Sequence, residues 1–163
     1  MEGTVKSNGV TFSERLQQII EKNLANYGWL EGLAPDKLFL AILLDKGSYG
    51  SLIVNSLMRD WEVERVIWRI WEAIGTPGPR GLVNICTLTG LCDYLSERLE
   101  IIYGGDLPPV LNTGHVVLAA LNDRRLYASR LTGLYSVRPI DVFNHMVRLP
   151  ADEEYRPRFT QSS

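Results

Sequence analysis

The 163-residue chain has few of the residue types on which enzymes and metal sites most often depend. It contains two histidines, His115 and His145, and two cysteines, Cys86 and Cys92. The cysteines are six residues apart, which fits neither a C-x-x-C redox motif nor a zinc-ligand spacing. We interpret them as buried free thiols in a reducing compartment. His115 stands at the start of an expected helix, where its ring can bond to the neighbouring backbone, so we expect a structural histidine.

Long apolar runs and an excess of one charge are also missing. The longest apolar run, LFLAILL at residues 38–44, has seven residues, whereas a membrane-spanning helix needs about 20. The formal net charge is −2, and no stripe of lysine and arginine points to nucleic acid. The first ten residues lack the cationic start and apolar stretch of a signal peptide. We therefore expect a cytoplasmic protein with no membrane and no nucleic-acid partner.

Motifs of catalysis are absent from the sequence as well. It has no G-x-S-x-G, no H-E-x-x-H and no Gly-rich phosphate loop. The stretch GTPGPRG at residues 75–81 lacks the terminal Gly-Lys-Ser/Thr, and its two prolines remove amides that a phosphate would need. We interpret it as a linker, and we predict that the chain is not an enzyme and binds no metal or cofactor itself. A small enzyme remains the alternative from a different class.

The chain does have helical periodicity and helix-capping residues. Leu16, Ile20 and Leu24 share one face at 3.6-residue spacing, and TFSE at residues 11–14 reads as a capping box with Thr11 as its N-cap. Residues 38–43 are apolar all round, which predicts a central, buried helix. Because no stretch shows sustained period-2 alternation, the sequence predicts an all-α fold.

Two further N-caps are predicted, Ser48 for a helix beginning near residue 49 and Thr113 for GHVVLAAL at residues 114–121. A later helix, WEVERVIWRIWEAI at residues 61–74, has Val63, Val66 and Ile70 on its inward face. Asp60 and Asp123 are the expected caps of the helices that follow them.

The apolar pattern occurs twice in the same order. LAPDKLFLAILLDKG at residues 33–47 matches LNTGHVVLAALNDRR at residues 111–125 with an offset of 78. An offset of 75 relates the first helix of each half, and an offset of 77 carries Val63 and Ile70 onto Ile140 and Val147. We therefore predict a pseudo-twofold domain of eight helices, built from a duplicated four-helix repeat.

The predicted organisation has five parts. They are a flexible arm (1–10), repeat one (11–74), a linker (75–82), repeat two (83–149) and an exit linker (150–163).

This doubled unit resembles the N-terminal domain of the Clp family of AAA+ unfoldases. Each family repeat opens with a motif like F-[ST]-x-[RK], which FSER at residues 12–15 matches. A second motif, G-T-E-H-L-L-L-A-L-L, is matched well by NTGHVVLAAL at residues 112–121 and more loosely by APDKLFLAILL at residues 34–44. A third, a leucine followed by G-[IV]-D-x-x-x-[VL], is echoed at residues 57–67 and 134–143. The resemblance covers roughly residues 11–149 and implies a divergent member.

The resemblance implies a non-catalytic module that binds substrate segments or an adaptor protein for an AAA+ ring, joined to it in cis or acting in trans. ATP would be bound by that ring and not by this domain, and the isolated domain would be a monomer. In some members, a hydroxyl of the first helix and an acid of the second bind phosphorylated arginine. The matching positions are Ser13 and Asp36 in repeat one, whereas repeat two has Gly114 in place of the acid.

Two alternatives within the resemblance stay open. One is the N-terminal domain of a type VI secretion ATPase, which recognises a helix of a sheath protein. The other is a free-standing adaptor. A groove that prefers one defined helix would favour the type VI secretion domain. Broad affinity for unfolded chains would favour a module that delivers substrates to a chaperone or protease.

Trp68 is a separate candidate for partner binding. At 100° per residue it lies about 140° from the inward stripe of its helix, and tryptophan is enriched at binding hot spots. We hypothesise that Trp68, with Trp29 or Tyr49, seats an apolar segment of a partner. The alternative is that Trp68 packs against the other repeat or the linker.

Overall fold

The computed structural model describes residues 11–27, 34–75, 85 and 87–151. Within these residues the fold is all-helical apart from one pair of two-residue strands, as predicted. The predicted arm 1–10, most of the linker 75–82 and most of the exit linker 150–163 lie outside the described residues. No single helix in the described ranges is long and apolar enough to cross a bilayer, and α2 with α3, which passes that test only as a pair, is bent by 82°.

The described elements follow one another in a simple order. The helices are α1 (Glu14–Tyr27), α2 (Pro35–Leu44), α3 (Tyr49–Leu57), α4 (Asp60–Gly75), α5 (Leu88–Tyr103), α6 (Thr113–Leu121), α7 (Tyr127–Gly133) and α8 (Pro139–Arg148), and the strands are β1 (Thr11–Phe12) and β2 (Val110–Leu111).

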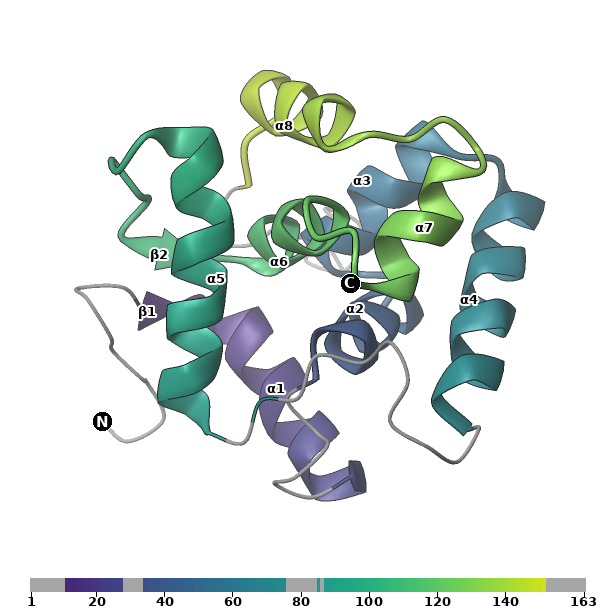
Figure 1. Cartoon of the computed structure of the whole chain (residues 1–163), viewed down its shortest axis with the longest axis horizontal. Helices are drawn as coiled ribbons and strands as arrows, with labels where there is room; N and C mark the ends of the chain where they lie inside the picture. Colours follow the sequence, from purple (N-terminus) through teal and green to yellow (C-terminus); the bar gives the residue numbers. More distant parts are fainter. Residues whose placement is uncertain (1–10, 28–33, 76–84, 86, 152–163) are drawn as a thin grey trace, which may run out of the picture.

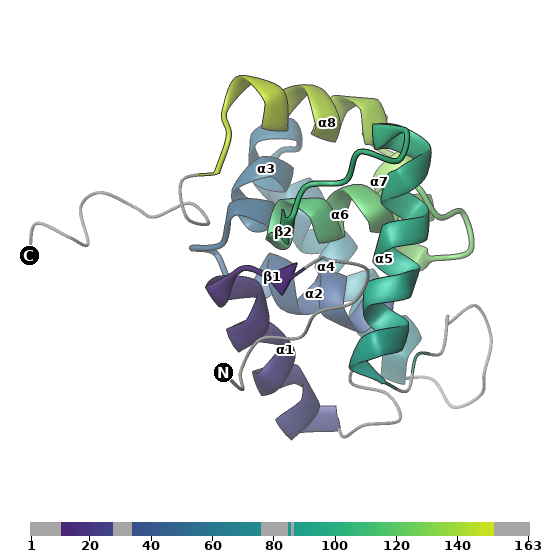
Figure 2. The same cartoon turned by 90° about the vertical axis from the view of Figure 1, so that its left-hand side faces the viewer.

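The two strands come from segments that are far apart in the sequence, and they pair in parallel. Thr11 lies opposite Val110 and Phe12 opposite Leu111, and Figure 2 shows β1 and β2 side by side. Two residues are too few to show alternation in a sequence, so this pair could not be predicted from pattern. It ties the start of α1 to the segment before α6.

Helices α2 and α6 form the centre of the molecule (Figure 1). All nine residues of α6 are buried, and so are eight of the ten residues of α2. A helix that is apolar on every side is stable only when other helices cover all its faces, which explains why these two became the core. The predicted burial of residues 38–43 is confirmed, except that Ala41 is half-buried.

The other helices surround this centre. Helix α2 packs against α1, α3 and α4 and also touches α6 and α7. Helix α6 packs against α5, α7 and α8 and also touches α2 and α3. Helix α3 reaches α8, and α7 reaches α4. The inward stripe predicted for α4 is confirmed, since Val63, Val66 and Ile70 are buried.

The helix caps are partly those predicted. Ser48 caps α3 as expected, because its hydroxyl accepts a hydrogen bond from the backbone nitrogen of Ser51 at 3.2 Å. The prediction for Thr11 is wrong, because Thr11 lies in β1 and Ser13 instead accepts from the nitrogen of Leu16 at 3.2 Å. Pairing with β2 extends the backbone there and delays the start of α1.

The predicted N-cap of α6 is also wrong by one residue. Asn112 is the cap, with its side-chain oxygen 3.1 Å from the backbone nitrogen of His115. In return, Nδ1 of His115 accepts from the nitrogen of Asn112 at 2.9 Å, which completes a capping box. Burial lowers the pKa of His115 to about 4, so the ring is a neutral acceptor at pH 7. The expected structural role of this histidine is confirmed.

Helix α8 does not bury the residues that the offset of 77 indicates. Ile140 and Val147 are 48% and 62% exposed, whereas Val142 and Met146 are buried. An offset of 79 instead carries the buried Val63 onto the buried Val142, so the alignment of this helix by an offset of 77 is wrong.

The N-terminal caps of α4 and α8 have the same form. The backbone nitrogen of Arg59 donates to the carboxylate of Glu62 at 2.9 Å, and that of Arg138 donates to the carboxylate of Asp141 at 2.9 Å. The predicted cap Asp60 is instead the first residue of α4.

Candidate functional site

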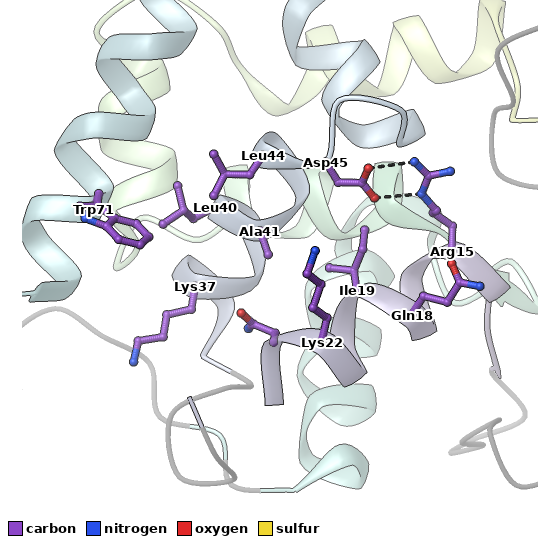
Figure 3. Close-up of a pocket in the computed structure, with 11 residues that line it drawn as sticks. Arg15, Gln18, Ile19, Lys22, Lys37, Leu40, Ala41, Leu44, Asp45 and Trp71 are labelled. Atoms are coloured by element: carbon purple, nitrogen blue, oxygen red, sulfur yellow. Dashed lines mark hydrogen bonds and ion pairs between the residues drawn. The ribbon is translucent and has the colours of Figure 1, made fainter. Parts of the chain in front are cut away.

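A groove of about 540 Å³ lies between α1, α2 and α4 (Figure 3), and we call it the α1–α2–α4 groove. Helix α1 contributes one wall, α2 the floor, and Trp71 of α4 the far end. It is lined by Arg15, Gln18, Ile19, Lys22, Asn23, Lys37, Leu40, Ala41, Leu44, Asp45 and Trp71.

The apolar part of the groove is open to solvent at one end. Ile19 in the wall and Leu40 in the floor are buried, but Leu44 and Trp71 remain 53% and 51% exposed. Figure 3 shows Trp71 at the opposite end of the groove from Arg15 and Asp45. A large aromatic side chain left half in solvent beside an apolar floor is a common anchor point for a partner.

The other end of the groove is closed by an ion pair between two helical segments. Nε of Arg15 donates to Oδ2 of Asp45 at 2.9 Å, and Nη2 donates to Oδ1 at 2.8 Å. Hydrogen bonds from Arg15 outweigh the opposing effect of burial and lower the pKa of Asp45. A Cβ atom at Gly47 would lie 2.6 Å from Nη2 of Arg15, so the glycine gives the guanidinium its space.

The polar lining of the groove is mainly cationic. The lining includes Arg15, Lys22 and Lys37 and one carboxylate, Asp45, which Arg15 engages. Lys37 is buried, and Figure 3 shows its side chain pointing away from Asp45. Lys22 is exposed at the rim, and Figure 3 shows its side chain extending from α1 towards α2. The combination of an apolar floor, an exposed tryptophan and the exposed Lys22 suits an apolar segment that carries acidic residues.

The lining residues do not include a serine, cysteine or histidine. They therefore offer no nucleophile with an adjacent base of the usual kind. In the described part of the chain, no group of three or more His, Cys, Asp or Glu side chains is arranged to hold a metal ion.

Comparison with protein-family models, with curated proteins and with solved structures gives no significant match to the chain. The site is therefore argued from its own geometry.

Of the residues that the sequence suggested as a binding site, the four that the structure describes lie outside the groove lining. Trp29 is not among the described residues. Ser13 is half-buried and caps α1, as given above, and its backbone nitrogen donates to the carbonyl of Leu111 at 2.8 Å.

Asp36 is fully buried and caps a helix of the other half. Its two carboxylate oxygens accept from the backbone nitrogens of Tyr127 at 2.9 Å and Ala128 at 2.8 Å, at the start of α7. Asp123, the predicted cap of this helix, instead accepts from Arg125 and Tyr94. Burial raises the pKa of Asp36 despite these hydrogen bonds. Its carboxylate does not face solvent, so the structure gives it a role inside the fold.

Tyr49 is likewise part of the core. It is 1% exposed, and its hydroxyl donates to the carbonyl of Leu149. A Cβ atom at Gly114 would lie 2.8 Å from the Tyr49 ring, so this ring occupies the space that a side chain would need at that position. Trp68 is 59% exposed on the outer face of α4. Tyr49 and Trp68 therefore do not share a solvent-facing surface.

Five residues that line the groove were not predicted as binding residues from the sequence: Arg15, Lys22, Leu44, Asp45 and Trp71. One signal for Asp45 was available, since DKGSY at residues 45–49 and DRRLY at residues 123–127 are 78 apart. Both aspartates accept hydrogen bonds from the first helix of their own half, Asp45 from Arg15 and Asp123 from Tyr94 at 2.6 Å. The meeting of α1, α2 and α4 at one groove depends on tertiary packing and has no local signal.

Proposed function

We propose that this domain is a non-catalytic binding module of a Clp-type AAA+ unfoldase. In this proposal the α1–α2–α4 groove holds a segment of a substrate or adaptor protein. The observation that carries the proposal is the groove itself, with an apolar floor, Trp71 at one end and the exposed Lys22 at its rim. A free-standing adaptor that acts on such a ring in trans would use the groove in the same way.

The helix packing supports descent from a duplicated four-helix unit. Each helix of the first half can be matched with the helix four places later, so that α1 corresponds to α5 and α2 to α6. Helix α2 contacts α1, α3 and α4, and α6 makes the corresponding contacts with α5, α7 and α8. In the same matching, the contact of α3 with α8 corresponds to the contact of α7 with α4.

The hydrogen bonds between the halves support the same relationship. Asp36, the second residue of α2, caps α7, while Thr113, the first residue of α6, accepts from the backbone nitrogen of Gly50 in α3 at 2.7 Å. Each central helix thus caps the third helix of the other half. This exchange between the halves is expected of a duplicated unit, and both residues lie in the stretches that resemble the second family motif.

The groove favours a partner segment with one or two large apolar anchors and neighbouring carboxylates. An affinity in the micromolar range, roughly −8 kcal/mol, suits a module that must release its cargo to a ring. Direct ion pairing with Lys22 would make the binding weaker as salt is added, because exposed charges are screened over about 10 Å at 0.1 M salt.

The test is fluorescence anisotropy with labelled peptides. The first is a 15-residue acidic amphipathic peptide with leucine and phenylalanine anchors, and the second is the same peptide with lysine in place of every acid. We expect the acidic peptide to bind at least tenfold more tightly. Trp71→Ala should weaken this binding at least tenfold, and Lys22→Glu should remove most of the preference for acid.

Trp68→Ala is the matched control, because it removes an exposed tryptophan from the same helix but outside the groove. Equal losses in Trp68→Ala and Trp71→Ala would count against the groove. A helix-stapled peptide and an unfolded peptide of the same composition separate recognition of one defined helix from general delivery of unfolded chains.

A further inference from the structure

Helix α4 exposes three tryptophans, and two of them lie on a single stripe. Trp61 and Trp68 are 52% and 59% exposed, and they are two turns apart. At 100° per residue the stripe also includes Arg65 and Glu72, all four within about 60°. Their spacings of four, three and four residues are those of the a and d positions of a coiled-coil seam. We call these four residues the α4 outer seam.

The seam faces away from the rest of the molecule. Helix α4 lies at the edge of the fold, with α2 and α7 on its inner side (Figure 1). Trp61 is held in place by Tyr135, whose ring meets it edge-on at 5.9 Å and 88°. An exposed tryptophan that is fixed by a neighbour loses little conformational entropy on binding, which favours its use as an anchor.

Two arginines of this helix, Arg65 and Arg69, are exposed to solvent. Arg65 and Arg69 make no hydrogen bond or ion pair with the described residues. Parallel pairing with a second copy would place Arg65 against Arg65 and Glu72 against Glu72. Antiparallel pairing places Arg65 of one copy over Trp68 of the other, where cation–π attraction is favourable. The same antiparallel arrangement places Arg69 of each copy beside Glu62 of the other, along one edge of the seam.

We propose that the α4 outer seam pairs with the α4 outer seam of a second copy of this chain, in antiparallel orientation, to form a weak homodimer. The pairing is isologous, so each favourable contact occurs twice. The two seam tryptophans alone offer roughly 250 Å² per copy, about a third of the 800 Å² per partner in an ordinary stable interface. The dimer therefore forms in the micromolar range or above.

This inference is independent of the proposed peptide binding, because Trp71 and the groove lie to one side of the seam. It differs from the monomer that the family resemblance implies.

Sedimentation equilibrium of the full chain from 5 to 500 μM tests the proposal. The expected result is a reversible monomer–dimer equilibrium. Trp68→Ala should raise the dimer Kd at least tenfold, while Trp71→Ala should change it at most threefold. A chain that stays monomeric over the whole range, or a dimer unaffected by Trp68→Ala, would overturn the proposal.

A charge exchange separates pairing from misfolding. Arg69→Glu and Glu62→Lys each place like charges opposite one another across the dimer and should each raise the Kd several-fold. The double variant carrying both changes restores opposite charges and should return the Kd to within about twofold of the original. Helix content by circular dichroism checks that each variant is folded. Additive weakening in the double variant would contradict the antiparallel register.

Discussion

The Oδ1 atom of Asp36 lies 2.8 Å from the backbone nitrogen of Ala128, 92 residues later in the sequence. The other oxygen of the same carboxylate accepts from the nitrogen of Tyr127 at 2.9 Å. Helix α7 has no side-chain cap of its own at Leu126. Its first amides are therefore satisfied by a charge from the opposite half, and the helix dipole at this end favours that charge.

Replacing Asp36 should destabilise the fold because two buried amides would lose their acceptors. We expect Asp36→Ala to lower the free energy of unfolding by about 2–4 kcal/mol, since unsatisfied buried donors cost about 1–3 kcal/mol each. The same substitution removes a buried carboxylate, which is itself unfavourable, so we expect a loss near the lower end of this range. Urea denaturation measures the change. Asp106→Asn, an exposed carboxylate on a loop, should stay within about 0.5 kcal/mol, and a similar value for Asp36→Ala would contradict the capping role.

Acid should weaken the fold through Asp123 and Asp45. Burial alone would raise the pKa of Asp123, but hydrogen bonds from Arg125 and Tyr94 outweigh it and hold the pKa at about 2, below the ordinary 3.8. The pKa of Asp45 is lowered as well. A depressed carboxyl pKa stabilises the fold above pH 3.8, and this contribution is lost as the pH falls towards 2. Asp36, whose pKa is raised, acts in the opposite direction and offsets part of the loss.

The urea midpoint should therefore fall between pH 4 and pH 2, with at most about 2 kcal/mol coming from Asp123. Arg125→Gln and Tyr94→Phe should make the fall shallower, because each removes a donor to the carboxylate of Asp123. A pH profile that neither variant alters would mean that acid acts elsewhere.

The central helices could be predicted because their sequences leave no polar face. The runs at 38–43 and 116–121 are apolar on all sides, and burial on all sides is the only stable outcome. The α4 stripe was equally clear, since Val63, Val66 and Ile70 repeat with the helix period. The α8 stripe was misassigned because Ile140, Phe143 and Val147 also repeat with that period, and sequence does not tell which of two apolar faces is inward.

The candidate site was not predictable in the same way. Asp36 was singled out by its family position and Tyr49 as an aromatic neighbour of Trp68, yet the first caps α7 and the second fills the space above Gly114. Both roles arise from contacts between the two halves. Helical periodicity describes only neighbouring residues, so it does not predict contacts between such distant parts of the sequence. Trp68 was placed correctly, because its angle on α4 depends only on helix geometry.

Gly114 should be intolerant of any side chain. A Cβ atom there would lie 2.8 Å from two carbons of the Tyr49 ring, which is itself buried. We expect Gly114→Ala to cost about 1–3 kcal/mol through overpacking. Gly133→Ala is the matched control, because a Cβ at this helical glycine meets nothing within 4 Å, and it should be neutral or stabilising by up to about 1 kcal/mol. In the Tyr49→Ala background, the cost of Gly114→Ala should largely disappear.

Gly47 controls the ion pair at the closed end of the groove. A Cβ at this position would lie 2.6 Å from Nη2 of Arg15, the end of a flexible side chain that can move aside. Gly47→Ala should therefore displace the guanidinium from Asp45 and let the pKa of Asp45 return towards 3.8, as measured by NMR titration. The pair is about 30% exposed on each side, so the free energy of unfolding should change by less than about 1 kcal/mol. With Arg15 released towards the groove, the acidic peptide should bind more tightly, and this gain should vanish when Arg15→Gln is added. An unchanged pKa of Asp45 in Gly47→Ala would show that the guanidinium keeps its place, and the glycine would then have no part in setting the charge of the groove.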